Sequence, residues 1–441
     1  MVQTKRFFLG DLVFRRVLTN SGWLLSANTI TLGLIFAQGV VVARALGAEQ
    51  YGVLSLITTY AATINQFVDS RVWEAAIKFV TEYREQGDLP RATATVKLCY
   101  LVDTATGILA FVLLLLTAGL AAKLFIKDSS ATGLIELYAL SVLISIPVGT
   151  SSALLRVGNR FEWLAYQSTG MAAFRLLGIL VALGLGSGLI GLLIVYLLAA
   201  AAGMVALLIL SLRVVRDLGL ISWRHAPLSL LRGKFKEIMR FLIATNGSAL
   251  FKLLQRNADI LLIGYWLNPT AVGYFRLARS MTDLMNFPVN PLYTASYPEF
   301  ARLWHRGELA ALRRLVRKLT LSSTCVALAA LFSIWLGGEW LILLTVGEQY
   351  LPALSVLRWL ALGVAIAVAT NFGHPLLLAI GRAPSSLLAI TVGVIAQLAA
   401  LIILLPIIGI VGAGIAYLSF YLVWVVIIAI ATRAAWANQL T

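Results

Sequence analysis

The side chains of this chain that could do chemistry are ionisable groups set inside long apolar segments. A charge at the bilayer centre costs at least about 2.5–3.5 kcal/mol on insertion scales, so each one suggests a function unless a partner neutralises it. Basic residues dominate two of these segments, and arginine binds phosphate or carboxylate oxygens through paired hydrogen bonds. We therefore expect an anion-binding site that contains Lys252, Arg256, Arg276 and Arg279, together with Asn65, Asn246 and Asn286.

Acidic side chains in the same segments are candidates for binding a proton or a cation. They are Asp69, Glu74, Asp259 and Asp283. Asp69 is the first candidate, because it falls in the middle of a predicted span and no basic residue lies three or four positions away. No resident cofactor is expected, and any coupling to H+ or Na+ is assigned to these carboxylates.

Pairing within one helix is the alternative explanation for several of these charges. Oppositely charged side chains three or four residues apart lie on one helix face and neutralise each other. Pairs with that spacing are Arg71–Glu74, Arg256–Asp259 and Arg279–Asp283. Such pairing would leave Asp69, Lys252 and Arg276 without a partner in their own helix.

Motifs of common enzyme classes are absent from the sequence. It contains neither a Gly-x-x-x-x-Gly-Lys-[Ser/Thr] phosphate loop nor a Gly-x-Ser-x-Gly nucleophile elbow. Its two cysteines, Cys99 and Cys325, and its three scattered histidines match no metal-site spacing and no disulfide framework. The chain is therefore expected not to be an enzyme and to hold no metal.

The composition indicates an integral membrane protein. The 441 residues are 60% apolar and 12% charged, with a mean hydropathy of +0.90, whereas soluble domains are about 45–50% apolar and about 25% charged. A helix crosses the hydrocarbon with about 20 mostly apolar residues. We predict an all-α polytopic protein with twelve transmembrane helices, at residues 22–44, 51–79, 96–121, 132–155, 163–185, 187–212, 237–265, 270–297, 319–337, 353–380, 384–405 and 409–432.

Basic residues between the spans predict the orientation. Lys and Arg number 25 in the segments on the amino-terminal side of the membrane and three on the opposite side. Cytoplasmic loops carry the excess of positive charge. We therefore expect the protein to lie in the inner membrane with both termini in the cytoplasm. The net charge of +16 is then mostly a topology signal, and nucleic-acid binding is not expected.

An internal repeat relates the two halves of the sequence. Leu46-Gly-Ala-Glu-Gln-Tyr-Gly52 aligns with Leu267-Asn-Pro-Thr-Ala-Val-Gly273 at an offset of 221 in the numbering. The same offset relates Gly188-x-x-Gly-x-x-x-x-Tyr196 to Gly409-x-x-Gly-x-x-x-x-Tyr417. Six spans per copy give a parallel repeat about an axis along the membrane normal, as in transporters whose halves rock about a central site. The predicted domains are an N-terminal lobe (1–213), a basic cytoplasmic linker (214–236) and a C-terminal lobe (237–441).

One cytoplasmic segment is predicted to lie on the membrane surface. Residues 308–319 place leucine and valine at helical spacing and arginine or lysine between them. An amphipathic basic helix of this kind binds anionic lipid, although the same charges also follow from the positive-inside rule.

Three segments resemble one family of membrane transporters. Arg44-Ala-Leu-Gly-Ala-Glu-Gln-Tyr-Gly52 is similar to the opening motif of the polysaccharide transporter branch of the MOP superfamily, which includes the Wzx-type oligosaccharide flippases. The stretch 257–264 followed by 271–274 resembles the start of that family's second half, and 405–414 resembles its penultimate loop. The likeness covers nearly the whole chain, but its motifs concern turns and packing.

The resemblance implies a fold and a function. It implies two six-helix lobes in a V and a central cavity lined by the first, second, seventh and eighth spans. It further implies alternating-access flipping of a polyprenyl-diphosphate-linked oligosaccharide to the outer leaflet, for O-antigen, capsule or exopolysaccharide synthesis. The expected partners are the lipid-linked oligosaccharide, membrane lipids including anionic ones, and the polymerase and chain-length proteins of the pathway, with the transporter itself a monomer.

Three alternatives to this function stay open. A drug or cation exporter of the same fold would favour acidic residues in its cavity, whereas the basic residues here argue for an anionic cargo. A lipid II flippase of the same superfamily often has two additional spans. A membrane polysaccharide polymerase or ligase would use a sizeable extracytoplasmic loop, and the predicted loops on that side are short.

Overall fold

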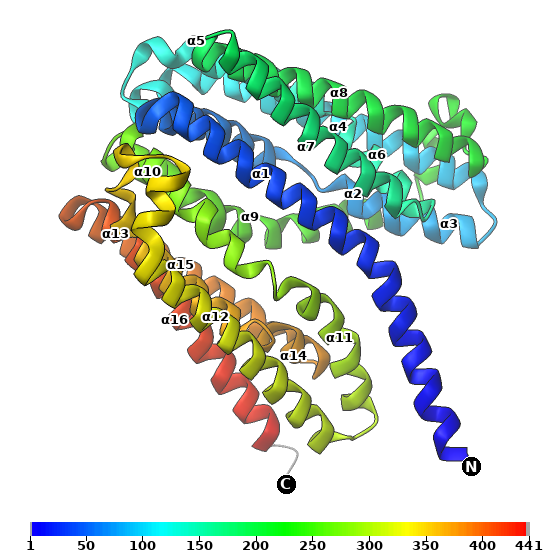
Figure 1. Cartoon of the computed structure of the whole chain (residues 1–441). Coiled ribbons are helices and arrows are strands. Elements are labelled where there is room, and N and C mark those ends of the chain that lie inside the picture. Colours follow the sequence, from blue (N-terminus) through cyan, green and yellow to red (C-terminus); the bar gives the residue numbers. More distant parts are fainter. Residues whose placement is uncertain (1, 438–441) are drawn as a thin grey trace. The chain divides into compact units, whose positions relative to one another are not determined.

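The computed structural model describes the backbone of residues 2–437. Side chains are described from Thr29 to Trp436, apart from Ile221, residues 243–252, Leu254, Pro291, Thr294 and Ala295. This part of the chain is almost entirely helical and divides into two compact units (Figure 1). Unit 1 contains Met1–Gln38, Ile64–Leu116 and Leu134–Ser248, and unit 2 contains Gly39–Thr63, Thr117–Gly133 and Ala249–Thr441.

Unit 1 holds most of the helices from the first half of the sequence. They are parts of α1 (Val2–Val68), α4 (Leu89–Ala121) and α5 (Thr132–Ser145), with α2 (Val72–Ala75), α3 (Thr81–Glu85), α6 (Val148–Val157), α7 (Phe161–Gly184), α8 (Gly188–Asp217) and the start of α9 (Phe235–Trp266). Helix α8 packs against α6 and α7. Phe79 and Tyr83, each 1% exposed, form a core with Leu154 of α6 and with Leu220 and Ile238 around the basic linker.

Unit 2 combines the second half of the sequence with the middle of α1. Its helices are the rest of α9, α10 (Pro269–Asp283), α11 (Asn290–His305), α12 (Leu309–Thr345), α13 (Ala353–Thr370), α14 (Gly373–Ala379), α15 (Ala383–Ile408) and α16 (Ile410–Ala437). Helix α16 packs along α13 and α15 in Figure 1, and α13 also packs on α12. Phe420 and Trp424 of α16 fill the core against Ala389 and Val394 of α15.

Nine helices of the described part are long and apolar enough to cross a membrane. The chain is therefore a multi-pass helical membrane protein. One of the nine, Thr29–Val68, includes residues 29–44 of the first predicted span and 51–68 of the second, because α1 continues through a kink at Gly47 (φ 77°, ψ 171°). The segments predicted as the seventh and eighth spans are not among the nine, because α9 contains residues whose side chains lie outside the described part and because α10 and α11 have only 15 and 16 residues. The count of twelve spans stays a prediction.

Four predicted spans are interrupted, so the prediction of continuous helices at 51–79, 132–155, 270–297 and 353–380 is wrong. In 132–155 the break separates α5 from α6, and in 353–380 it separates α13 from α14. Helix α1 ends at Val68, and Arg71 adopts a left-handed conformation (φ 47°) before α2 begins. The Asp69 carboxylate accepts a hydrogen bond from the Arg71 amide at 3.0 Å, a local contact that competes with helix. In the second half, α10 ends at Asp283, and α11 starts only at Asn290.

Candidate functional site

An ion pair inside unit 2 joins two of the predicted site residues. Arg279 of α10 donates from Nη1 to Asp259 Oδ2 of α9 at 2.5 Å, and the two side chains are 11% and 1% exposed. The pair is interhelical, whereas the sequence alternative paired each residue within its own helix. Among the described side chains, neither Arg256–Asp259 nor Arg279–Asp283 forms an ion pair. Arg279 is thus fixed against α9 by a nearly dry contact.

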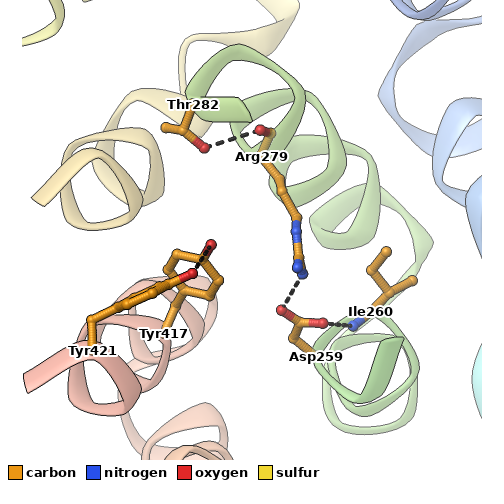
Figure 2. A network of polar contacts seen from close by, with 6 residues as sticks. All are labelled: Asp259, Ile260, Arg279, Thr282, Tyr417 and Tyr421. Carbon is orange, nitrogen blue, oxygen red and sulfur yellow. Dashed lines mark hydrogen bonds and ion pairs between the residues drawn. The ribbon is translucent and has the colours of Figure 1, made fainter. Parts of the chain in front are cut away.

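Two tyrosines of α16 complete the surroundings of this ion pair (Figure 2). The Arg279 guanidinium lies over the Tyr417 ring, with 5.4 Å from Cζ to the ring centroid. The Tyr417 and Tyr421 hydroxyls are 3.2 Å apart, and their rings meet edge to face. On α10 itself, the Thr282 hydroxyl donates to the Arg279 carbonyl at 3.0 Å. Three helices of one unit therefore position a single arginine.

Two further predicted arginines lie near the ion pair and are solvent-exposed. Arg256 of α9 and Arg276 of α10 are exposed, and Asp283 lies within electrostatic range of both and of Arg279. Arg276 also approaches the hydroxyl of buried Tyr51. The described ionised groups of this cluster are three arginines and two carboxylates, so its net charge is positive. Arg256, Asp259, Arg276, Arg279 and Asp283 are called the Arg279 cluster below.

The remaining predicted residues are distributed over both units. Asn286 is partly exposed in the short 3-10 turn after α10. Asn65, Asp69 and Glu74 belong to unit 1. Glu74 pairs with Arg71 three residues earlier, as the spacing suggested, although Arg71 lies just before α2 and not within a continuous helix. The side chains of Lys252 and Asn246 lie outside the described residues.

Sequence reasoning missed two polar contacts in unit 1. Asp103 of α4 is 7% exposed, and its Oδ2 accepts hydrogen bonds from the Thr150 amide at 3.0 Å and the Thr150 hydroxyl at 2.6 Å. Arg175 of α7 donates from Nε to the Gln38 side-chain oxygen at 2.7 Å. A lone charge inside an apolar run is the signal that could have drawn attention to Asp103. No sequence pattern signals its partner, because Thr150 lies on another helix.

The fold and the site together define a class: a polytopic helical membrane protein with a cationic cluster anchored by a buried ion pair. The chain belongs to the polysaccharide biosynthesis protein family, whose model matches residues 17–304. It is 24% identical to the inner membrane protein YghQ of Escherichia coli K12, over 80% of this chain and 98% of that protein.

Solved structures show the same fold. An inward-facing multidrug resistance MATE family transporter of the MOP superfamily superposes with a TM-score of 0.77 at 15% identity, over 93% of this chain and 96% of that one. The lipid II flippase MurJ in an inward closed conformation gives 0.70 at 14% identity, over 93% and 87%. The predicted polysaccharide family is confirmed by the family model, and the solved structures, one of them named as a MOP superfamily transporter, share the fold of this chain.

Proposed function

We propose that this protein flips a polyprenyl-diphosphate-linked oligosaccharide from the cytoplasmic to the outer leaflet by alternating access. The observation that carries the proposal is the Arg279 cluster, which places three arginines in a membrane protein of a polysaccharide biosynthesis family. An anionic diphosphate gains charge-assisted hydrogen bonds from guanidinium groups, and these are about twice as strong as neutral ones. The same charges would repel a cationic drug.

The members of the cluster have different roles in this proposal. Exposed Arg256 and Arg276 contact the diphosphate, because their guanidinium groups have no ion-pair partner among the described side chains. Arg279 is neutralised by Asp259, so it fixes the packing of α10 on α9, and the positive potential comes from Arg256 and Arg276. Asp283 competes with the diphosphate for these arginines and favours its release. Partly exposed Asn286 offers an amide to the sugar hydroxyls.

We also propose that the two halves of the chain arose by duplication and form twelve spans. Backbone breaks with positive φ recur within one position of the repeat offset, at Gly87 and Gly307, Lys127 and Gly347, Asn159 and Gly381, and Gly188 and Gly409. The close contact between α1 and α10 supports the same relation. A Cβ on Gly52 would lie 1.7 Å from the Pro269 carbonyl oxygen, and one on Gly273 would lie 2.1 Å from that of Ala48. Gly52 and Gly273 are equivalent in the repeat, and so are Ala48 and Pro269, as expected for a contact across a local twofold axis.

The proposed setting is the inner membrane, with both termini in the cytoplasm and a monomeric transporter. The relative YghQ is named an inner membrane protein, and the Lys and Arg asymmetry supports the orientation. At the predicted cytoplasmic end of α12, Arg313 lies 4.6 Å from the Trp436 ring. A basic surface with an interfacial tryptophan suits anionic headgroups. The polymerase and chain-length proteins of the pathway remain proposed partners.

Two alternatives have a specific supporting observation. The MATE neighbour supports a drug exporter, and the MurJ neighbour supports lipid II as the cargo. Because the two likenesses are at only 15% and 14% identity, they concern the fold. The net positive charge of the cluster favours a diphosphate cargo, and an enzymatic role has no supporting group of residues in the described part.

The test is glycolipid export in cells that depend on this protein for surface polysaccharide. The Arg256→Gln, Arg276→Gln double variant should lower export at least about tenfold, the equivalent of one lost charge-assisted hydrogen bond. Arg→Lys changes at the same two positions should lower export less than the Arg→Gln changes if charge dominates binding, and by as much if bidentate geometry dominates. Arg433→Gln, at the predicted cytoplasmic end of α16, is the matched control and should export normally. Normal export by the double variant at unchanged protein level would contradict the proposal, and a loss of drug resistance instead would favour the exporter.

A further inference from the structure

A second arginine cluster lies within unit 1. Arg175 of α7 donates to Gln38 of α1, and Gln38, which is 3% exposed, donates its own amide to the Ala172 carbonyl at 2.6 Å. The Arg175 guanidinium lies over the Tyr196 ring of α8, with 5.4 Å from Cζ to the ring centroid. Gln38, Arg175 and Tyr196 are called the Arg175 cluster here.

Two members of this cluster have counterparts in the Arg279 surroundings. At the repeat offset of 221, Gln38 corresponds to Asp259 and Tyr196 corresponds to Tyr417. The geometry corresponds as well. Each arginine reaches its acceptor within 2.7 Å, and each lies 5.4 Å from its tyrosine ring.

The arginine itself comes from a different helix in each half. The counterpart of Arg279 in the first half is Thr58, which bonds the carbonyl of Leu54 in its own helix. The counterpart of Arg175 on α15, one position beyond the repeat offset, is Gln397. Each half thus has the acceptor and the tyrosine at equivalent positions, but the arginine comes from helices that are not equivalent in the repeat.

The two clusters differ in charge. Asp259 neutralises Arg279, whereas Gln38 is neutral, and no ion pair within the described part of the chain involves Arg175. Helix α7 is one of the nine candidate membrane helices. A guanidinium without a counter-charge is costly there unless water or an anion solvates it.

We propose that the Arg175 cluster is an oxyanion-binding site that takes a phosphate or carboxylate group. Gln38 engages Nε, so it fixes the guanidinium plane and leaves the edge formed by Nη1 and Nη2 for a bidentate contact. Arg175 is partly exposed, so an anion can reach it. The site does not depend on the flippase proposal, because an anionic cargo and a phospholipid headgroup share this chemistry.

The test is a calorimetric titration of the full-length protein with sodium pyrophosphate in phosphatidylcholine nanodiscs at constant ionic strength. Every protein carries Arg256→Gln and Arg276→Gln, so that the exposed arginines of the Arg279 cluster cannot bind pyrophosphate. The protein with these two changes alone is called the background protein. Binding should remain in this background. Arg175→Gln should abolish it, and Gln38→Glu should weaken it at least about tenfold, because the new carboxylate neutralises Arg175 as Asp259 neutralises Arg279.

The Gln38→Glu variant protects the test against misfolding. It adds an ion pair to Arg175 at nearly constant volume but loses the amide donor to the Ala172 carbonyl, so monodispersity and melting temperature are measured with binding, and the protein should stay monodisperse. Arg433→Gln is the control and should bind like the background protein. No binding in the background, or equal affinity in the background and in Gln38→Glu, would overturn the proposal. Neither result bears on the export assay, which tests the other two arginines.

A second arm identifies the source of the anion. Nanodiscs that contain phosphatidylglycerol present a net anionic phosphate from the bilayer, whereas the choline group of phosphatidylcholine neutralises its own phosphate. If headgroups fill the site, they should lower the apparent affinity for pyrophosphate in the background protein. An unchanged affinity assigns the site to anions that arrive with the cargo.

Discussion

The Arg175 and Arg279 clusters show how two halves of one chain can keep a geometry and change its charge. In both, an arginine lies over a tyrosine of the last helix of its half and bonds an acceptor on the first. The acceptor is neutral Gln38 in one half and charged Asp259 in the other. The first arrangement leaves a positive charge in the protein, and the second forms a buried ion pair.

This difference predicts unequal energetics at equivalent positions. A buried ion pair is a modest contributor when intact, but removing one partner is severe because the other charge stays uncompensated. A neutral acceptor contributes about one hydrogen bond to a charged group. The Asp259 site is therefore suited to fixing the packing of α9 on α10, and the Gln38 site to holding an arginine ready for a ligand.

The largest expected effect comes from removing the two acceptors. Asp259→Ala should lower the free energy of unfolding by about 3–5 kcal/mol, and Gln38→Ala by about 1.5–3 kcal/mol. Equilibrium unfolding by sodium dodecyl sulfate in mixed micelles measures both. Arg279→Gln combined with Asp259→Asn is the control, because it leaves neither charge alone and should recover part of the loss. Equal losses for the two alanine variants would remove the distinction between the clusters.

The next largest effect is expected at two glycines that are equivalent in the repeat, where substitution should destabilise both halves alike. Gly52→Ala and Gly273→Ala each place a methyl group against a backbone carbonyl, at 1.7 and 2.1 Å, so something must shift. Overpacking of this kind costs about 1–3 kcal/mol, and both variants should fall near the upper end. Gly170→Ala in α7 is the control, since a Cβ there meets nothing within 4 Å. A large loss in one variant and none in the other would argue against a twofold contact.

A smaller effect should appear at a carboxylate that only the first half possesses. Asp103 corresponds to Thr324 at the repeat offset, and Thr324 bonds the Thr320 carbonyl of its own helix at 2.7 Å. Thr150→Val removes a hydroxyl donor from Asp103 and should cost about 1.5–2 kcal/mol, as a hydrogen bond to a charged group. Thr324→Val should stay within about 0.5 kcal/mol. Unfolding midpoints of the two variants, measured side by side, check this prediction. Equal losses of stability would show that Asp103 does not depend on the Thr150 hydroxyl.

The sequence predicted the membrane class, the family and the residues of the Arg279 cluster, because these depend on composition, local motifs and lone charges. It did not predict the partners. Spacing of three or four residues suggested Arg256–Asp259, whereas the observed partner of Asp259 is Arg279, which lies on the next helix. Local spacing was sufficient only for Arg71–Glu74, which lies within one turn.

The interruption at Asp69 was missed for a related reason. Hydropathy averages over a span and does not register one short side chain that bonds the backbone two residues later. Gln38 was missed because a neutral amide in an apolar run carries little signal. Its importance depends on Arg175, which packs against it from a helix that is remote in the sequence.

The smallest expected effect separates the aromatic ring from its hydroxyl in the two halves. Tyr417→Phe keeps the ring under the arginine but leaves the Tyr421 hydroxyl without its partner at 3.2 Å, which should cost about 0.5–1.5 kcal/mol. The position equivalent to Tyr421 in the first half is Ala200, so this pair of hydroxyls exists only in the second half.

Replacing phenylalanine by leucine then removes the cation–π contact, worth about 0.5–2 kcal/mol. Because the arginine lies 5.4 Å from the ring centroid in both clusters, this second step should cost the same at positions 417 and 196. A clearly larger second step at position 417 would mean that the aromatic geometry is not shared between the halves, and the correspondence between the clusters would then rest on the acceptors alone.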